Sequence, residues 1–262
     1  MKNFLKIFEP LTVIHRQTVL IMVIIQIIFI FVLWQIFGNA LIPGPIQVAK
    51  SIIHILASNE FIDNIYESVS LTIKGMFYSI LIALVISYLS LIPFFKPLSG
   101  FIVKCRYLTL TGLIFLFTLL TKDGHQLKIS LLIFGIVPFF VTSLISIIEE
   151  INVQEYELCK TLRMNNWEIL WEVVIVGQFD KVFEVMRQNF AISWMMITMV
   201  EGLNMSEGGL GTMLIKSSKY IDLGTVFGIL FIILTIGISF DFLLSKMRFW
   251  LFRYAKFKTI EQ

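Results

Sequence analysis

Long apolar runs separated by short polar stretches dominate the pattern of this chain. The first run, TVLIMVIIQIIFIFVLWQIF at 18–37, carries no charge and matches the ~20 residues that an α-helix needs to cross a bilayer. Further apolar runs follow at intervals down to residue 244. We predict an all-α fold, a polytopic integral membrane helical bundle with six transmembrane helices at about 18–37, 69–92, 107–121, 127–148, 182–203 and 222–244.

The third of these runs, YLTLTGLIFLFTLLT at 107–121, is short. At ~1.5 Å per residue a helix of this length reaches only about 22 Å. It is counted as a span because leaving it out would invert every later segment and spoil the distribution of basic residues described next.

Basic residues concentrate on one side of the predicted bundle. Fifteen of the 21 lysines and arginines fall in segments that six spans place on the same side, namely 1–17, 93–106, 149–187 and 245–262. Because cytoplasmic segments carry the excess of Lys and Arg, we expect a multi-pass protein of the bacterial inner membrane with both termini in the cytoplasm. The transmembrane domain then covers 18–244, between an N-terminal tail at 1–17 and a basic C-terminal tail at 245–262.

Composition and short motifs exclude several classes of function. Only 15% of residues are charged, against ~25% in soluble domains, and the net charge of +3 comes without a basic run that would suit nucleic acid. No phosphate-binding G-x-x-x-x-G-K-[ST] loop is present, and His15, His54 and His125 are too scattered for a metal motif. We therefore expect no catalytic residue, metal or cofactor in this chain; Cys105 and Cys159 lie in segments placed in the reducing cytoplasm.

A charged, Trp-bearing stretch, EYELCKTLRMNNWEILWEVV at 155–174, interrupts the apolar pattern. Apolar residues recur at helical spacing in both halves, and Asn165 and Asn166 between them suit a turn between two short helices. One alternative is an interfacial helix pair with Trp at the lipid headgroups. The excess of acidic residues beside an anionic membrane surface favours contact with another protein instead.

Polar residues within and just after the run at 182–203 are candidates for a pathway. Asn189, Ser193 and Thr198 either line it or make hydrogen bonds between helices. Glu201 is either a solvated interface charge or a gate or docking group, and the GGLG at 208–211 either a tight turn or a contact for a delivery protein. Asp241 is expected to snorkel or to pair with a cation.

The run ELCKTLRMNNWEILWEVVIVG resembles the EAA motif, E-A-A-x-x-x-G, of ATP-binding-cassette importer permeases. Glu157 matches the Glu and Lys160-Thr161-Leu162 the usual R-T-L, while Arg163 stands at the Gly and Val176 at a common Pro. With that Gly missing, we expect the turn to be made at Met164-Asn165-Asn166. Segments resembling the nitrate, sulfonate and taurine group of this family follow in order: IPGPIQVAKSIIHIL (42–56), Glu201 with GLNMSEGGLGTML (202–214), and DLGTVFGILFIILTIGISFDFLLSKM (222–247).

The resemblance implies a type I importer permease. The resembled group implies a small solute of the nitrate, sulfonate, taurine or vitamin-precursor class. It implies a permease homodimer in membrane lipid, fed by an extracytoplasmic solute-binding protein and driven by a separate cytoplasmic ATPase dimer that uses the ATP. The cytoplasmic coupling loop is then 149–181, and the coupling residues are Glu157, Lys160, Thr161, Arg163, Asn165, Trp167 and Trp171. The alternative is a non-transporting scaffold, or a divergent partner subunit, that docks a cytoplasmic protein through the same loop.

Overall fold

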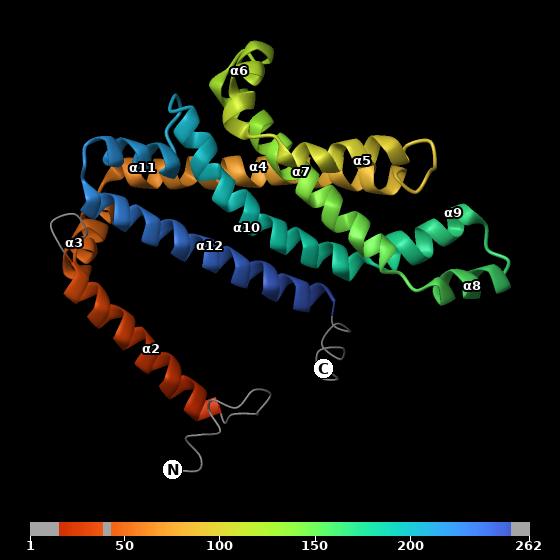
Figure 1. Cartoon of the computed structure of the whole chain (residues 1–262), viewed down its shortest axis with the longest axis horizontal. Helices are drawn as coiled ribbons and strands as arrows, with labels where there is room; N and C mark the ends of the chain where they lie inside the picture. The colour runs from red at the N-terminus through yellow and green to blue at the C-terminus, as the bar shows by residue number, and fades with distance from the viewer. Residues whose placement is uncertain (1–15, 39–42, 253–262) are drawn as a thin grey trace.

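The computed structural model describes residues 16–38 and 43–252, and every regular element within these ranges is helical (Figure 1). The all-α prediction is therefore confirmed for this part of the chain. The predicted tails at 1–17 and 245–262 lie largely outside the described ranges.

Three long helices form the centre of the bundle: α4 (Asn59–Leu89), α7 (Gly124–Glu149) and α10 (Phe179–Leu203). Apolar residues are fully buried where they face one another, with Leu71 from α4, Leu132 from α7 and Ile197 from α10. Gly75 of α4 faces Leu132 so closely that a Cβ there would lie 3.1 Å from its Cγ. Small and branched residues thus let these helices pack at short range, as is usual within membranes.

The last helix, α12 (Leu223–Leu251), packs against α10 and against two shorter helices, α3 (Pro45–Leu56) and α11 (Leu210–Lys219). Pro45 is at the start of α3, where a backbone N–H has no acceptor within the helix. The N–H that proline lacks therefore costs no helical hydrogen bond. Between α10 and α12, the indole Nε1 of Trp194 donates a 2.9 Å hydrogen bond to the carbonyl of Ile233. This bond ties the two helices together at mid-length.

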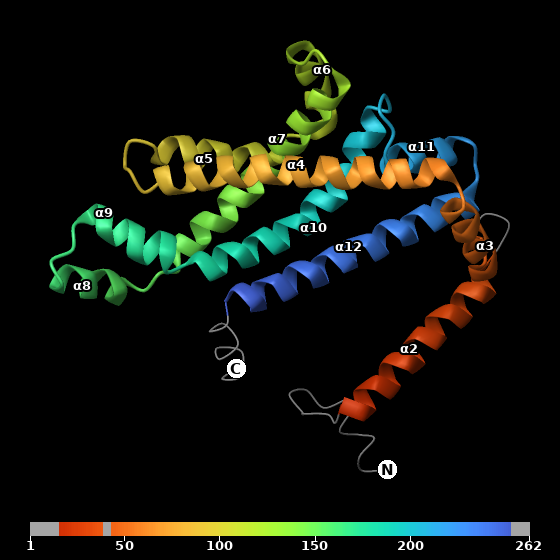
Figure 2. The same ribbon diagram turned by 180° about the vertical axis from the view of Figure 1, so that it is seen from behind.

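The first helix, α2 (Arg16–Phe37), diverges from the rest of the chain (Figures 1 and 2). None of its most apolar 18-residue window is buried. Trp34 ties it to the bundle: its ring stacks on Phe231 of α12 at 5.8 Å, and its indole N–H donates to the Pro43 carbonyl. An apolar helix exposed on all sides requires lipid or another protein around it.

The predicted third span is not a straight helix. Helix α5 (Lys96–Lys104) continues into a 3₁₀ turn (Cys105–Tyr107), and α6 (Leu110–Leu120) then departs at 114°. By length and composition four described helices can cross a membrane, namely α2, α4, α7 and α12, and the bent pair would add a fifth. The chain is thus a helical multi-pass membrane protein, and the count of six spans stays a prediction.

Two short helices project from one end of the bundle, opposite the end that carries α3 and α11 (Figures 1 and 2). They are α8 (Val153–Thr161) and α9 (Asn166–Ile169), the latter continuing as a π-helix over Leu170–Val176 that leads toward α10. We call residues 153–176 the projecting loop. It lies between α7 and α10, two of the three central helices, so a force on it acts on the core of the bundle.

Candidate functional site

The projecting loop contains all seven residues predicted for coupling, and all seven are exposed in this chain. They are Glu157, Lys160, Thr161, Arg163, Asn165, Trp167 and Trp171. The two indoles are the most unusual of these, with 67% of Trp167 and 58% of Trp171 exposed. The buried positions of this segment are Ile169, Val173 and Val174, so both indoles lie outside the apolar contact with the bundle.

The turn between α8 and α9 is made at Arg163, not at Met164-Asn165-Asn166 as the sequence suggested. Arg163 adopts φ +58°, the left-handed conformation that a Gly takes most readily. The N–H of Met164 donates to the Cys159 carbonyl and that of Arg163 to the Lys160 carbonyl, which is the hydrogen-bond pattern of a Schellman helix end. The resembled motif has Gly here, so this chain keeps the backbone shape with a residue that strains it.

The start of α9 is fixed by Asn165 rather than left as a flexible link. Its side-chain oxygen accepts from the Asn166 N–H at 3.1 Å, and the Glu168 carboxylate accepts from the Asn165 N–H at 2.6 Å. This reciprocal capping box satisfies backbone donors that would otherwise lack partners. Glu168 is therefore held in place locally, and the like-charged Glu172 one turn on lies within the π-helical segment.

The second departure from the resembled motif lies at the end of the π-helix. Val176 ends this segment, and the Gly177 N–H donates to the Glu172 carbonyl five residues earlier at 2.9 Å. A Cβ at Gly177 would lie 2.7 Å from the Val173 carbonyl oxygen, so this wider turn needs a glycine. Such π segments recur at functional sites, because they reorient the side chains that follow.

A small apolar cluster anchors the projecting loop to the bundle. Ile151, Ile169, Val173 and Val174 are buried together, with Tyr88 from the end of α4 packed against them. Burial raises the pKa of the Tyr156 phenol beside this cluster, and the Glu155 carboxylate raises it further, so the phenol stays neutral. The loop is thus packed against the bundle and does not hang free.

A groove of about 510 Å³ separates the projecting loop from the turn after α4. Tyr156, Lys160 and Trp167 form one wall, and Leu91, Ile92 and Pro93 form the other. Its lining is mainly apolar with one cation at the rim, a composition typical of a protein-binding surface.

The four predicted pathway residues separate into two environments. Asn189 and Ser193 are buried inside the chain, where the Asn189 amide donates to the Val185 carbonyl and the Ser193 hydroxyl to the Asn189 carbonyl, within α10 itself. Thr198 lies instead on a second groove, of about 500 Å³ between α10 and α12, together with Trp194 and Asp241. Of these residues, Thr198 is accessible from the surface of the chain, whereas Asn189 and Ser193 are not.

Glu201 is fully buried, which rules out the solvated interface charge that the sequence left open. Its carboxylate accepts from the Ser68 hydroxyl at 2.6 Å and from the Gly211 N–H at 2.7 Å. Its backbone carbonyl accepts from the Thr212 hydroxyl at 3.0 Å. One side chain of α10 thereby joins α4 and the start of α11.

The glycines of GGLG make the turn that places α11 against Glu201. Gly208 and Gly209 have φ +79° and +110°, so the predicted turn is confirmed, although it leads into α11 rather than directly into α12. Gly211 has ordinary φ but lies against α10: a Cβ there would be 2.7 Å from the Thr198 Cα. Its hydrogen side chain is what allows this approach.

Charged side chains near the other end of α10 form an ion network with α12. Arg187 pairs with Asp241 and with Glu184 at 2.6 Å each, and Glu184 pairs with Arg248 at 2.6 Å. The prediction that Asp241 pairs with a cation is confirmed, with Arg187 as the partner. The network links the N-terminal half of α10 to the C-terminal half of α12, the two helices that border the second groove.

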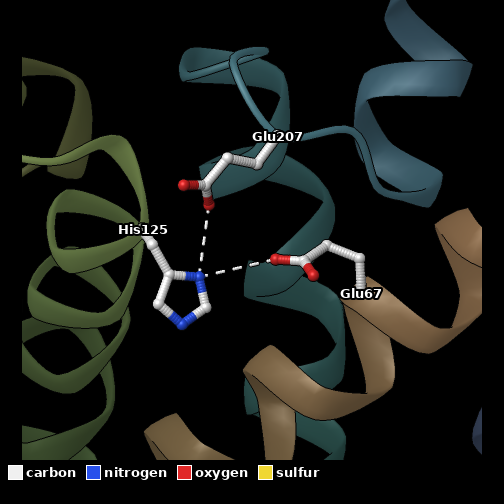
Figure 3. Close-up of side chains that lie close together, drawn as sticks. All are labelled: Glu67, His125 and Glu207. Atoms are coloured by element: carbon white, nitrogen blue, oxygen red, sulfur yellow. Dashed lines mark hydrogen bonds and ion pairs between the residues drawn. The ribbon is translucent and has the colours of Figure 1, made fainter.

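Sequence reasoning missed one cluster at the end of the bundle away from the projecting loop (Figure 3). Glu67, His125 and Glu207 come from α4, the start of α7 and the loop after α10, and their ligand atoms lie within 4.8 Å of one another. No local spacing could have revealed them, since 58 and 82 positions separate consecutive members.

Comparison with known protein families and with curated proteins gives no match for this chain. Comparison with solved structures does: a chain from the crystal structure of an amino acid ABC transporter with histidines superimposes with a TM-score of 0.57. The likeness covers 80% of this chain and 96% of that one at 15% sequence identity. The two chains therefore share a helical membrane fold.

Proposed function

We propose that this chain is the permease subunit of an ATP-binding-cassette importer, that it forms a transmembrane pathway for a small solute, and that it couples to a separate ATPase through the projecting loop. Two independent lines support this. The ordered motifs resemble those of importer permeases. The fold is similar to that of an amino acid ABC transporter chain.

The observation that carries the proposal is the exposure of the projecting loop. Leu158, Leu162, Trp167 and Trp171 all present more than half of their surface in a segment interleaved with Glu157 and Lys160. Large apolar groups rimmed by charges are typical of protein-binding surfaces, and Trp in particular dominates binding energy at them. A cytoplasmic ATPase is the partner that the motif resemblance implies.

Coupling follows from how the loop is attached. Its ends continue into α7 and α10, and its buried cluster also contacts Tyr88 of α4. A displacement that nucleotide binding produces in the ATPase therefore reaches all three central helices through packed side chains. Because a partner shifts an equilibrium only by binding two states differently, the exposed contacts must differ between inward-open and outward-open forms.

The solute is proposed from the resembled group: nitrate, a sulfonate such as taurine, or a vitamin precursor. The groove beside Thr198, Trp194 and Asp241 offers a small polar molecule both apolar and polar groups. A thermal-shift screen of a solute-binding protein that copurifies with this chain tests the assignment. Stabilisation by amino acids alone would reassign the solute without affecting the coupling proposal.

Copurification with a candidate ATPase subunit, sought first among the genes that adjoin this one, tests the coupling. Glu157→Arg reverses an exposed charge on α8 and is expected to abolish copurification and solute-stimulated ATP hydrolysis, because it alters the proposed contact surface. Glu60→Arg is the matched control, since it reverses an exposed charge at the opposite end of α4. Retention of the ATPase by Glu157→Arg and by Trp167→Ala alike would refute the docking role of the loop.

A maleimide that cannot cross membranes gives the second test. In a Cys105→Ser, Cys159→Ser background, a cysteine introduced by Leu158→Cys is expected to react only after the cells are opened. Labelling in intact cells would place the loop outside the cell and exclude an ATPase partner.

A further inference from the structure

Glu67, His125 and Glu207, whose side-chain types can ligate metals, lie close together (Figure 3), at the end of the bundle away from the projecting loop. Nδ1 of His125 lies 3.2 Å from Glu207 Oε2 and 3.5 Å from Glu67 Oε1. Each side chain comes from a different part of the chain: α4, the first turn of α7, and the loop joining α10 to α11. The imidazole in Figure 3 points into the space between the two carboxylates.

These spacings fit the coordination sphere of a small divalent ion. Ligand atoms placed tetrahedrally at the ~2.0–2.1 Å that zinc makes with nitrogen and oxygen are about 3.3–3.4 Å apart. The two measured separations, 3.2 and 3.5 Å, lie on either side of that value. Small rotations of the carboxylates are enough to complete the third edge, since all three atoms already lie within 4.8 Å.

The donor set also matches the chemistry of such an ion. One imidazole and two carboxylates suit zinc and its neighbours among the transition metals better than calcium or magnesium, which prefer oxygen alone. Each side chain is about one-quarter to one-third exposed, so water can occupy a fourth position. Three protein ligands with an open position are typical of an accessible zinc site.

The ligands are positioned by contacts that do not involve them. The Asn204 amide donates to the Gly124 carbonyl at 3.2 Å, which holds the loop against the start of α7. The Gly209 N–H donates to the Asn64 side chain at 2.7 Å, which holds the same loop against α4. The three segments are thus already brought together, and an ion need not order them.

One neighbouring charge opposes a cation. The buried ammonium of Lys128 lies 4.0 Å from Glu207 Oε2 and donates to the Gly208 carbonyl at 3.2 Å. Two carboxylates against one ammonium still leave a net negative site with neutral imidazole. We therefore expect Lys128 to weaken cation binding without abolishing it.

From these observations we propose that Glu67, His125 and Glu207 bind a divalent transition-metal ion of the zinc class. The ion joins α4, α7 and the loop before α11 at one end of the bundle, and so restrains their relative movement. The proposal rests on the cluster alone and is independent of the transport function.

Zinc titration of the purified, metal-stripped full chain in detergent tests this, with a chromophoric chelator as competitor. The wild type is expected to bind one zinc ion saturably and to melt at a higher temperature with zinc. His125→Gln and Glu207→Gln are each expected to weaken binding by at least ~10–100-fold, the loss common when even a supporting residue of a metal site is removed. His54→Gln, which removes an exposed histidine of α3, is the matched control and is expected to bind as the wild type does.

Two further variants separate this site from other zinc binding. Lys128→Met is expected to tighten binding, because it removes the opposing charge while filling the same buried space. The double variant Cys105→Ser, Cys159→Ser is expected to bind unchanged, and cobalt in place of zinc to give a spectrum without a thiolate charge-transfer band. Equal zinc affinity in the wild type and His125→Gln, weaker binding in Lys128→Met, or loss of binding in the cysteine variant would each overturn the proposal.

Discussion

Replacing Gly211 by Ala probes the close approach of α11 to α10. A Cβ at this position would lie 2.7 Å from the Cα and 2.9 Å from the carbonyl carbon of Thr198, and nearer still to its carbonyl oxygen. These are backbone atoms of a long helix and cannot rotate away. Reaching ordinary contact at about 3.4 Å requires α11 to move by roughly 1 Å, a forced repacking of the kind that costs ~1–3 kcal/mol.

That movement also strains the hydrogen bonds of Glu201. The Gly211 N–H donates to the buried Glu201 side chain at 2.7 Å, and a hydrogen bond of this kind contributes about 0.5–1.5 kcal/mol. Ala gains back up to ~1 kcal/mol relative to Gly, because it loses less backbone freedom on folding. We therefore expect Gly211→Ala to lower the free energy of unfolding by about 1–4 kcal/mol.

The assay is the apparent melting temperature of the full chain in detergent, followed by gel filtration of the protein that stays soluble after heating. Gly100→Ala is the matched control, because Gly100 lies in α5 and nothing lies within 4 Å of a Cβ built there. The control is expected to melt at or slightly above the wild-type temperature, and Gly211→Ala several degrees below it. Equal melting of the two variants would refute the packing of α11 on α10 described above.

Three further predictions concern the projecting loop and the ion network. Arg163→Gly is expected to stabilise the turn by up to about 1 kcal/mol, since Arg163 has φ +58°, and to slow proteolysis of the loop, whereas Arg163→Val is expected to speed it. Asn165→Ala removes the cap of α9 and is expected to cost ~1 kcal/mol, measured as faster proteolysis or amide exchange at α9. Glu184→Gln breaks two ion pairs and is expected to lower the melting temperature more than Asp241→Asn, which breaks one half-exposed pair worth at most ~1 kcal/mol; an equal effect would contradict the central place of Glu184.

Structural features that depend on residues close together in the sequence were predictable. Apolar runs predicted the helices α2, α7 and α12 to within a few residues at most ends, because membrane length and helical rise leave few alternatives. The two short helices of the projecting loop followed from apolar spacing and the intervening Asn pair. The predicted position of the turn was wrong. Asn165 caps α9, whereas Arg163, two residues earlier, adopts the left-handed conformation of the turn.

The predicted third span shows that the length of an apolar run does not by itself establish a straight membrane-spanning helix. The stretch at 107–121 is apolar enough for a membrane, yet the structure bends by 114° where α6 begins. Apolarity sets the solvent that a segment prefers, while its direction depends on which neighbours it packs against. The span count is therefore less secure from sequence than the helical content.

By itself the sequence determined that this protein is helical and built for a membrane, and that a charged, Trp-bearing loop interrupts it, because these follow from composition and from periodicities of three to four residues. Only the tertiary structure decided that Glu201 is buried between three helices and that Glu67, His125 and Glu207 meet at one end of the bundle. The members of each set are far apart along the chain, and only the packing of α4, α7 and α10 brings them within bonding distance. No rule based on spacing along one helix contains that information.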